Sequence, residues 1–138
     1  ETWVRRDTQV TPREPEPAYW MAGVQEGEVA VLVGAAGVNK SSHDSGMTWE
    51  ENMKPGREGL FGVALGEGDL PVIAGAVGLI GAMSDDGEWQ MADRTELKLL
   101  SWIKTPVSMP DGSLLVLGGR GTAITVTDGK ISRLPMLQ

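Results

Sequence analysis

Residues 34–38 read Gly-Ala-Ala-Gly-Val, and similar stretches follow at 75–79 (Gly-Ala-Val-Gly-Leu) and 118–122 (Gly-Gly-Arg-Gly-Thr). The G-x-x-G pattern thus recurs after 41 and then 43 residues. Each copy follows an apolar run typical of a buried strand and precedes a second, alternating run. The sequence therefore contains three copies of one strand–turn–strand unit.

A repeat of this length, made of strands and tight turns, is typical of the blades of a β-propeller. We therefore expect an all-β fold in which each copy is a four-stranded antiparallel blade. The predicted strands are 18–23, 28–34, 38–43 and 47–52; 60–65, 70–75, 79–83 and 88–92; and 99–107, 113–118, 123–127 and 130–134. Residues 1–17 are expected to form an N-terminal strand and a Pro-rich loop, and residues 18–138 the three-blade segment.

One segment also fits a different structure. Residues 93–104 carry a possible N-cap at Asp93 or Thr95 and could form a helix. The repeat places the first strand of the third blade over the second half of this segment. The repeat register therefore favours a strand.

Composition excludes several kinds of function. The chain has 138 residues, with 12 Lys and Arg against 19 Asp and Glu, so its net charge is −7. A nucleic-acid partner is not expected, because phosphates require a basic face. The absence of cysteine and the single histidine, His43, exclude Cys-ligated and multi-His metal sites. The loops of Asp44 and Asp86 lack the spaced acidic ligands of an EF-type calcium site. We therefore expect neither a metal nor a cofactor. No apolar run reaches the length of a membrane span.

Residues 42–49 match the pattern Ser-x-Asp-x-Gly-x-Thr-Trp at every fixed position. Asp44 can accept hydrogen bonds from the N–H groups of its own turn. Gly46 supplies a positive φ, and the Trp49 ring can cover the hairpin. Each feature closes a turn, so we interpret these residues as structural.

Two weaker copies of this pattern follow at the same place in the next repeats. Residues 84–89, Ser-Asp-Asp-Gly-Glu-Trp, form a contracted copy, and Asp128-Gly129 keeps only the turn.

This pattern is the Asp-box, or BNR repeat, and with the G-x-x-G turns the sequence resembles the photosystem II stability/assembly factor-like family of the sialidase-like superfamily. The resemblance covers residues 18–135. It implies a propeller that acts as a non-enzymatic scaffold for a protein partner, in an extracytoplasmic compartment. It also implies a structural role for the Asp-box residues Ser42, Asp44, Gly46, Thr48, Trp49, Ser84, Asp86, Gly87 and Trp89.

An arginine-bearing face is implicated in docking within that family. Arg120, inside the third G-x-x-G copy, and Arg57, between the first two repeats, are the candidate binding residues. We expect their two turns to lie at opposite ends of the strands, so that the two arginines do not form one clamp.

The alternative function is part of a sialidase-like glycoside hydrolase. Such an enzyme needs an arginine triad and a tyrosine nucleophile, but Tyr19 is the only tyrosine and the Arg-Ile-Pro signature is absent. The paired acidic residues lie in turns and are expected to form a solvated edge. No catalytic residue is therefore assigned.

Three blades do not close a propeller ring, which needs at least about four. We expect a homodimer that forms one six-bladed ring, or further blades outside this sequence. Thr2-Trp3 resembles the end of another Asp-box and is expected to lie on an extra outer strand.

Overall fold

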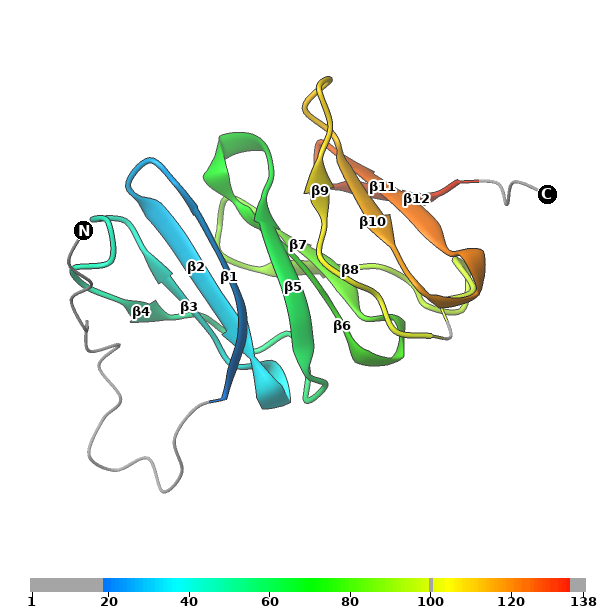
Figure 1. The fold of residues 1–138 in the computed structure, drawn as a ribbon, viewed down its shortest axis with the longest axis horizontal. Coiled ribbons are helices and arrows are strands. Elements are labelled where there is room, and N and C mark those ends of the chain that lie inside the picture. Colours follow the sequence, from blue (N-terminus) through cyan, green and yellow to red (C-terminus); the bar gives the residue numbers. More distant parts are fainter. Residues whose placement is uncertain (1–18, 100, 135–138) are drawn as a thin grey trace, which may run out of the picture.

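The computed structural model describes residues 19–99 and 101–134, and these form three four-stranded antiparallel sheets (Figure 1). The predicted strand and loop of residues 1–17 lie outside the described residues. Sheet 1 contains β1 (Trp20–Glu26), β2 (Val29–Gly34), β3 (Asn39–Ser42) and β4 (Glu50–Glu51). Sheet 2 contains β5 (Leu60–Leu65), β6 (Pro71–Gly75), β7 (Ile80–Met83) and β8 (Trp89–Met91). Sheet 3 contains β9 (Val107–Ser108), β10 (Leu114–Leu117), β11 (Ala123–Thr127) and β12 (Lys130–Arg133).

Within each sheet the strands are neighbours in chain order. This arrangement confirms the prediction of an all-β fold with three four-stranded units. Short 3-10 segments occupy the turns, namely η1 (Ala35–Gly37), η2 (Glu67–Asp69), η3 (Ala76–Gly78) and η4 (Gly119–Gly121).

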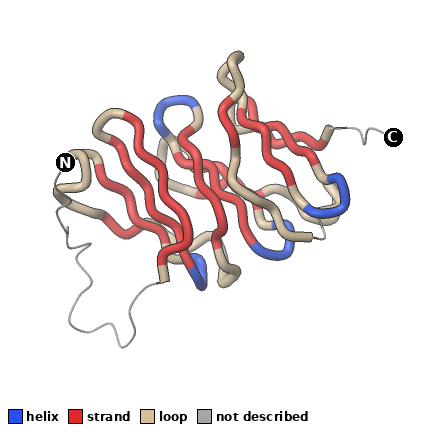
Figure 2. Tube along the Cα trace, viewed as in Figure 1, coloured by secondary structure: helices blue, strands red, loops and turns tan. Residues whose placement is uncertain are grey.

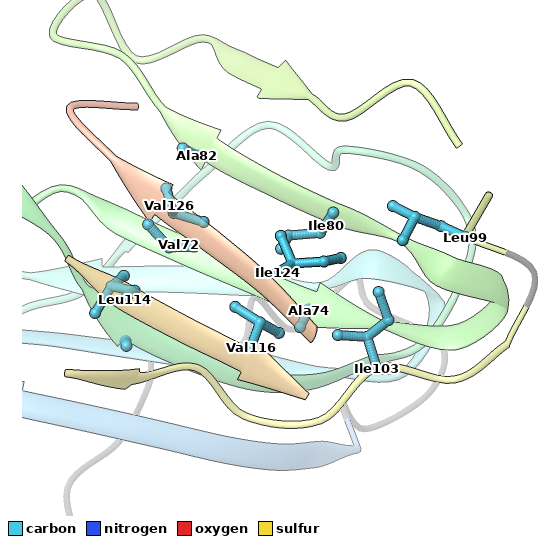
Figure 3. Packing of buried hydrophobic residues seen from close by; sticks show 11 residues of the cluster. Val72, Ala74, Ile80, Ala82, Leu99, Ile103, Leu114, Val116, Ile124 and Val126 are labelled. Carbon is cyan, nitrogen blue, oxygen red and sulfur yellow. The ribbon is translucent and has the colours of Figure 1, made fainter. Parts of the chain in front are cut away.

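The sheets pack side by side through two separate apolar clusters. One cluster joins sheets 1 and 2 and includes Val31, Val33, Leu60 and Ile73. The other joins sheets 2 and 3 (Figure 3), and its buried members are Ala64, Val72, Ala74, Ile80, Ala82, Leu99, Ile103, Leu114, Val116, Ile124 and Val126. Alternate residues of a strand point to opposite faces, so β6 contributes to both clusters.

The G-x-x-G turns have the same backbone geometry in all three sheets. The first glycine donates its N–H to the carbonyl four residues later, at 2.9, 2.8 and 2.9 Å for Gly34, Gly75 and Gly118. The third position, which is Ala36, Val77 or Arg120, has a φ between 54° and 57°. The conserved geometry of this turn across the repeats explains why the motif marks the same place in each sheet.

The first glycine of each turn is required by close packing of backbone. A Cβ on Gly34 would lie 2.1 Å from the Tyr19 carbonyl oxygen, and a Cβ on Gly75 would lie 2.2 Å from that of Gly59. These carbonyls accept hydrogen bonds from Ala35 and Ala76, which hold the two segments together. Any larger residue would force the turn away from the first strand of its sheet.

The predicted strand 99–107 is wrong over most of its length, and the helix alternative is also wrong. The Asp93 carboxylate accepts hydrogen bonds from the N–H groups of Thr95 and Glu96 at 2.9 and 3.0 Å. A short series of turns then carries Leu99 into the core. Here only the short strand β9 pairs with β10, and an isolated bridge joins Ile103 to Gly118 just after β10.

Strand β3 is polar and yet buried. Its residues Asn39, Lys40, Ser41 and Ser42 have exposed fractions between 0 and 7%. The Asn39 side-chain amide donates to the carbonyls of Gly37 and Met53 at 3.1 and 3.3 Å. Sheet 1 thus differs from sheets 2 and 3, whose third strands are largely apolar.

Candidate functional site

The turns of all three sheets gather at two opposite ends (Figure 2). The G-x-x-G end holds η1, η3 and η4 together with the connections between sheets, residues 52–59, 92–99 and 101–106. The turn η1 packs tightly against the connection 52–59. A Cβ added to Gly37 in η1 would lie only 2.2 Å from the carbonyl oxygen of Gly56 in that connection. The hairpin end holds the other turns, and the Ser45 N–H there donates to the Glu28 carbonyl at 2.9 Å.

Arg57 and Arg120 both lie at the G-x-x-G end, and both are exposed. The prediction that they lie at opposite ends of the strands is wrong. In an antiparallel four-stranded sheet, the second and fourth strands run in the same direction and finish at the same end. The turn after the second strand carries Arg120, and the connection after the fourth strand carries Arg57.

Charge is distributed unevenly between the two ends. The basic residues of the G-x-x-G end are Lys54, Arg57, Arg94, Lys98, Lys104, Arg120 and Arg133. The acidic residues of the hairpin end are Glu26, Glu28, Asp44, Glu67, Asp69, Asp85, Asp86, Glu88, Asp111 and Asp128. Each end also carries residues of the opposite charge. The acidic residues at the G-x-x-G end are Glu58, Asp93 and Glu96, and the basic residue at the hairpin end is Lys130. An acidic protein therefore presents one basic end.

Two of the basic side chains at this end are held by neighbours. Arg94 forms an ion pair with Glu58 at 2.9 Å, and Arg133 donates to the carbonyls of Leu97 and Lys98 at 2.7 and 3.0 Å. The backbone N–H of Glu58 and the Arg94 guanidinium lower the pKa of the Glu58 carboxyl. These two arginines stabilise the connections around the exposed ones.

An exposed tryptophan accompanies the basic residues of sheet 3. Trp102 is 50% exposed, and the Lys104 ammonium nitrogen lies 5.9 Å from the centre of its ring. The Trp102 carbonyl accepts a hydrogen bond from Gly119, the residue before Arg120, at 3.0 Å. Tyr19, the residue whose carbonyl has the same role in sheet 1, is also exposed. The structure therefore groups Trp102, Lys104 and Arg120 in a patch that we call the Trp–Arg patch.

Sequence reasoning missed Trp102 and Lys104 because it assigned both to a strand. The repeat alignment contains the signal that would have found Trp102. Trp102 is equivalent to Tyr19, since the carbonyl of each residue accepts a hydrogen bond from the second residue of a G-x-x-G turn. These turns lie at the exposed end of the sheets.

The hairpin of residues 42–49 is closed by its own side chains. The Asp44 carboxylate accepts from the Thr48 hydroxyl at 2.6 Å, from the Thr48 N–H at 2.8 Å and from the Ser42 hydroxyl at 2.8 Å. Gly46 has a φ of 85°, and its carbonyl accepts from the Trp49 ring N–H at 3.1 Å. Every one of these bonds stays within the hairpin, as expected for a structural role.

Hydrogen bonds from the Thr48 hydroxyl and N–H lower the pKa of Asp44 from 3.8 to about 2. A carboxylate with a lowered pKa stabilises the fold above its unfolded pKa, and this contribution is lost as the pH falls through the folded pKa. Asp44→Asn is therefore expected to lower the melting temperature at neutral pH, with the difference from wild type vanishing between about pH 4 and pH 2. Circular dichroism melts across this range measure the effect.

The matched control is Asp85→Asn, because Asp85 lies in the next hairpin beside Asp86, the residue equivalent to Asp44, and its carboxylate makes no turn contact. Its melting temperature is expected to stay close to that of wild type. Equal melting curves for Asp44→Asn and wild type at every pH would contradict the assignment of the Asp44 contacts.

The second copy of the pattern is closed differently. The Ser84 hydroxyl donates to Asp86 and the Glu88 N–H donates to Asp86 at 3.3 Å, which lowers the pKa of Asp86. Gly87 has a φ of 82°. The Trp89 ring N–H, however, donates to the Met53 carbonyl at 2.7 Å, outside its own hairpin. Trp89 thus ties sheet 2 to the connection that follows sheet 1.

A cavity of about 500 Å³ lies at the hairpin end between sheets 2 and 3. Val72 and Leu114 are among its apolar lining residues, and Glu67 and Asp128 are among its acidic ones. A hydrogen bond with Asp128 and the negative charge of that residue raise the pKa of Glu67. The cavity therefore brings together two carboxyl groups from different sheets.

Within the described residues, His, Asp and Glu side chains form no group of three or more that could hold a metal ion. The same part of the chain has no helix with the length and hydropathy that crossing a membrane requires.

No protein-family model matches this sequence, and no curated protein matches it significantly. The resemblance to Asp-box propellers therefore rests on residues 42–49 and on the spacing of the G-x-x-G turns.

Proposed function

We propose that this chain is a non-enzymatic protein-interaction scaffold, built from blades of an Asp-box propeller, that docks on an acidic surface of a partner protein through its G-x-x-G end. The separation of charge between the two ends carries this proposal. The resemblance to photosystem II assembly factor-like proteins supports it through the arginine-bearing face of that family. With this resemblance we also propose an extracytoplasmic location.

The chemistry of the Trp–Arg patch suits protein recognition. Tryptophan and arginine are the residues most enriched at the energetic centres of protein interfaces. Positive charge on one end of a chain with a net charge of −7 orients that end toward an acidic partner and turns the rest of the molecule away. The hydrogen bond from the Gly119 N–H to the Trp102 carbonyl joins the two backbone segments that carry Arg120 and Trp102.

The cavity between sheets 2 and 3 favours the alternative, a sialidase-like glycoside hydrolase. Glu67 and Asp128 are two carboxyl groups at a cavity of ligand size. Glycosidases hold their carboxyl groups about 5 Å or more apart, so that a sugar ring fits between them. Glu67 and Asp128 lie close enough that Asp128 raises the pKa of Glu67, and this closeness ranks the alternative second.

Fluorescence anisotropy with a labelled peptide of alternating glutamate and leucine tests the scaffold proposal. We expect binding that weakens as salt is added, and the variant Arg57→Glu/Arg120→Glu should weaken it by about tenfold or more. Lys130→Glu reverses one charge at the hairpin end, as each of the two arginine changes does at the G-x-x-G end, and should leave binding nearly unchanged.

Equal losses in the two variants, or no binding by wild type, would contradict docking through the G-x-x-G end. A screen with fluorogenic glycosides addresses the alternative. Turnover that Glu67→Gln abolishes would replace the scaffold proposal with hydrolysis.

A further inference from the structure

The core between sheets 2 and 3 ends in the cavity at the hairpin end. With about 500 Å³, this cavity has the volume of a small-molecule site. Its floor is formed by Val72, Ala82, Leu114 and Val126, which Figure 3 shows at the end of the cluster opposite Leu99. A molecule in the cavity would therefore rest directly on the apolar core.

The turns around the mouth of the cavity leave it open because they contain glycine. The glycines that line the cavity are Gly66, Gly68, Gly112 and Gly129. A Cβ on Gly68, Gly112 or Gly129 would meet no other atom within 4 Å. Longer side chains at these positions would have the room to fold over the floor. The sequence thus leaves the space above the floor unfilled.

The mouth of the cavity is acidic. Glu67 and Asp85 from sheet 2 and Asp128 from sheet 3 line it, and all three are exposed. The hydrogen-bonding and charge interactions with Asp128 raise the pKa of the Glu67 carboxyl, so these two groups oppose each other's ionisation. Between the described residues, the one ion pair joins Arg94 to Glu58 at the opposite end. The carboxylates at the mouth therefore have no positive partner within the described part of the chain.

We propose that this cavity binds a small organic amine, with its ammonium group between Glu67 and Asp128 and its apolar body on the floor. An ammonium group removes the repulsion between the two carboxylates, which a neutral sugar would leave in place. A metal ion would also remove it but would gain nothing from the apolar floor. A cleft lined by one sign of charge concentrates ions of the opposite sign, and the other acidic residues of the hairpin end add to this attraction.

This site is independent of the proposed docking function. The cavity lies at the hairpin end, whereas the proposed docking surface lies at the G-x-x-G end. Binding of an amine and binding of an acidic peptide can therefore be measured separately, and the failure of one leaves the other in place.

Isothermal titration calorimetry of wild type with phenylbutylamine at neutral pH tests the proposal. We expect a dissociation constant of about 1 mM or tighter. Phenylbutanol carries the same apolar body without the charge and should bind about tenfold more weakly or worse. The absence of saturable amine binding, or equal binding of the two compounds, would overturn the proposal.

Glu67→Gln removes one carboxylate from the mouth and is expected to weaken amine binding about fivefold or more, while phenylbutanol binding stays unchanged. Glu26→Gln is the matched control. Glu26 lies eight residues before the first glycine of its G-x-x-G turn, as Glu67 does, but outside the cavity. Amine affinity that is equal in Glu67→Gln and Glu26→Gln would contradict the position assigned to the ammonium group.

Gly66→Leu fills the cavity without a change of charge. Gly66 has a φ of −89°, which other residues also adopt. A Cβ there would lie 3.4 Å from Cγ2 of Val72 and 3.8 Å from Cδ1 of Leu114, at ordinary contact distances. We expect this variant to lose binding of both compounds. Wild-type affinity in folded Gly66→Leu would overturn the proposal, and Glu67→Gln decides the matter if Gly66→Leu does not fold.

A capped peptide with one lysine between alanines separates a free amine from the lysine side chain of a partner. Both offer an ammonium group on an apolar chain. We expect the peptide to bind more weakly than phenylbutylamine, because the lysine side chain has no aromatic ring to cover the floor. Equal or tighter binding of the peptide would overturn the free amine as the occupant.

Discussion

Gly75→Ala is expected to leave little folded protein. The new Cβ would lie 2.2 Å from the Gly59 carbonyl oxygen, which is already fixed by its hydrogen bond from Ala76 at 2.9 Å. The turn and the start of β5 must separate, which breaks the packing of Leu60 in the core. We expect a loss of about 4 kcal/mol or more in the free energy of unfolding, measured by urea denaturation.

The control for this change is Gly68→Ala. Gly68 has a φ of 69°, but nothing lies within 4 Å of a Cβ built there. Only the backbone conformation is strained, at a cost of about 1–2 kcal/mol. Similar losses in the two variants would show that close packing does not decide the G-x-x-G turn.

Ile73→Ala is expected to have the second largest effect. Ile73 is fully buried on β6, in the cluster between sheets 1 and 2 with Val63 and Leu79. Removing three carbon atoms from this site leaves a cavity, and such changes cost about 2–5 kcal/mol. Ile73→Val removes one carbon and should cost about 1 kcal/mol. Urea denaturation of both variants measures the two losses in the free energy of unfolding, and the loss for Ile73→Ala should be the larger.

Val77→Ala is the matched surface control. Val77 is 59% exposed and has a φ of 54°, which a β-branched residue adopts only with strain. This variant should stay within about 0.5 kcal/mol of wild type. A cost below about 1 kcal/mol for Ile73→Ala would contradict the packing of sheets 1 and 2 described here.

Local patterns predicted the sheets well. The strand β5 has the predicted bounds, and β6 differs by one residue, because the apolar runs and the G-x-x-G turns are set by nearby residues. The contacts within the hairpin 42–49 are also local, so the hydrogen bonds to Asp44 and the positive φ of Gly46 could be predicted from residue chemistry. Propeller closure and partner binding depend on contacts that no such pattern encodes, and they remain proposals.

Predictions failed where distant contacts decide the structure. Leu99 leaves the expected strand because the core between sheets 2 and 3 accepts its side chain, and Asp93 stabilises the turn before it. Trp89 matches Trp49 in sequence but bonds to Met53, a residue from another sheet's connection. The expectation that Arg57 and Arg120 lie at opposite ends of the strands failed for a different reason. The direction of the strands alone places both residues at the same end, so the sequence already contained the correct answer.

The two apolar clusters share no residue, and this separation governs how the molecule loses structure. Sheet 2 is packed on both faces, whereas sheets 1 and 3 are each joined to the stack through one cluster. The chain therefore behaves as a one-dimensional array in which each unit is stabilised by its nearest neighbours. Partial unfolding begins at the terminal sheets, and the amide hydrogens of β6 and β7 are the last to exchange with deuterium in the solvent.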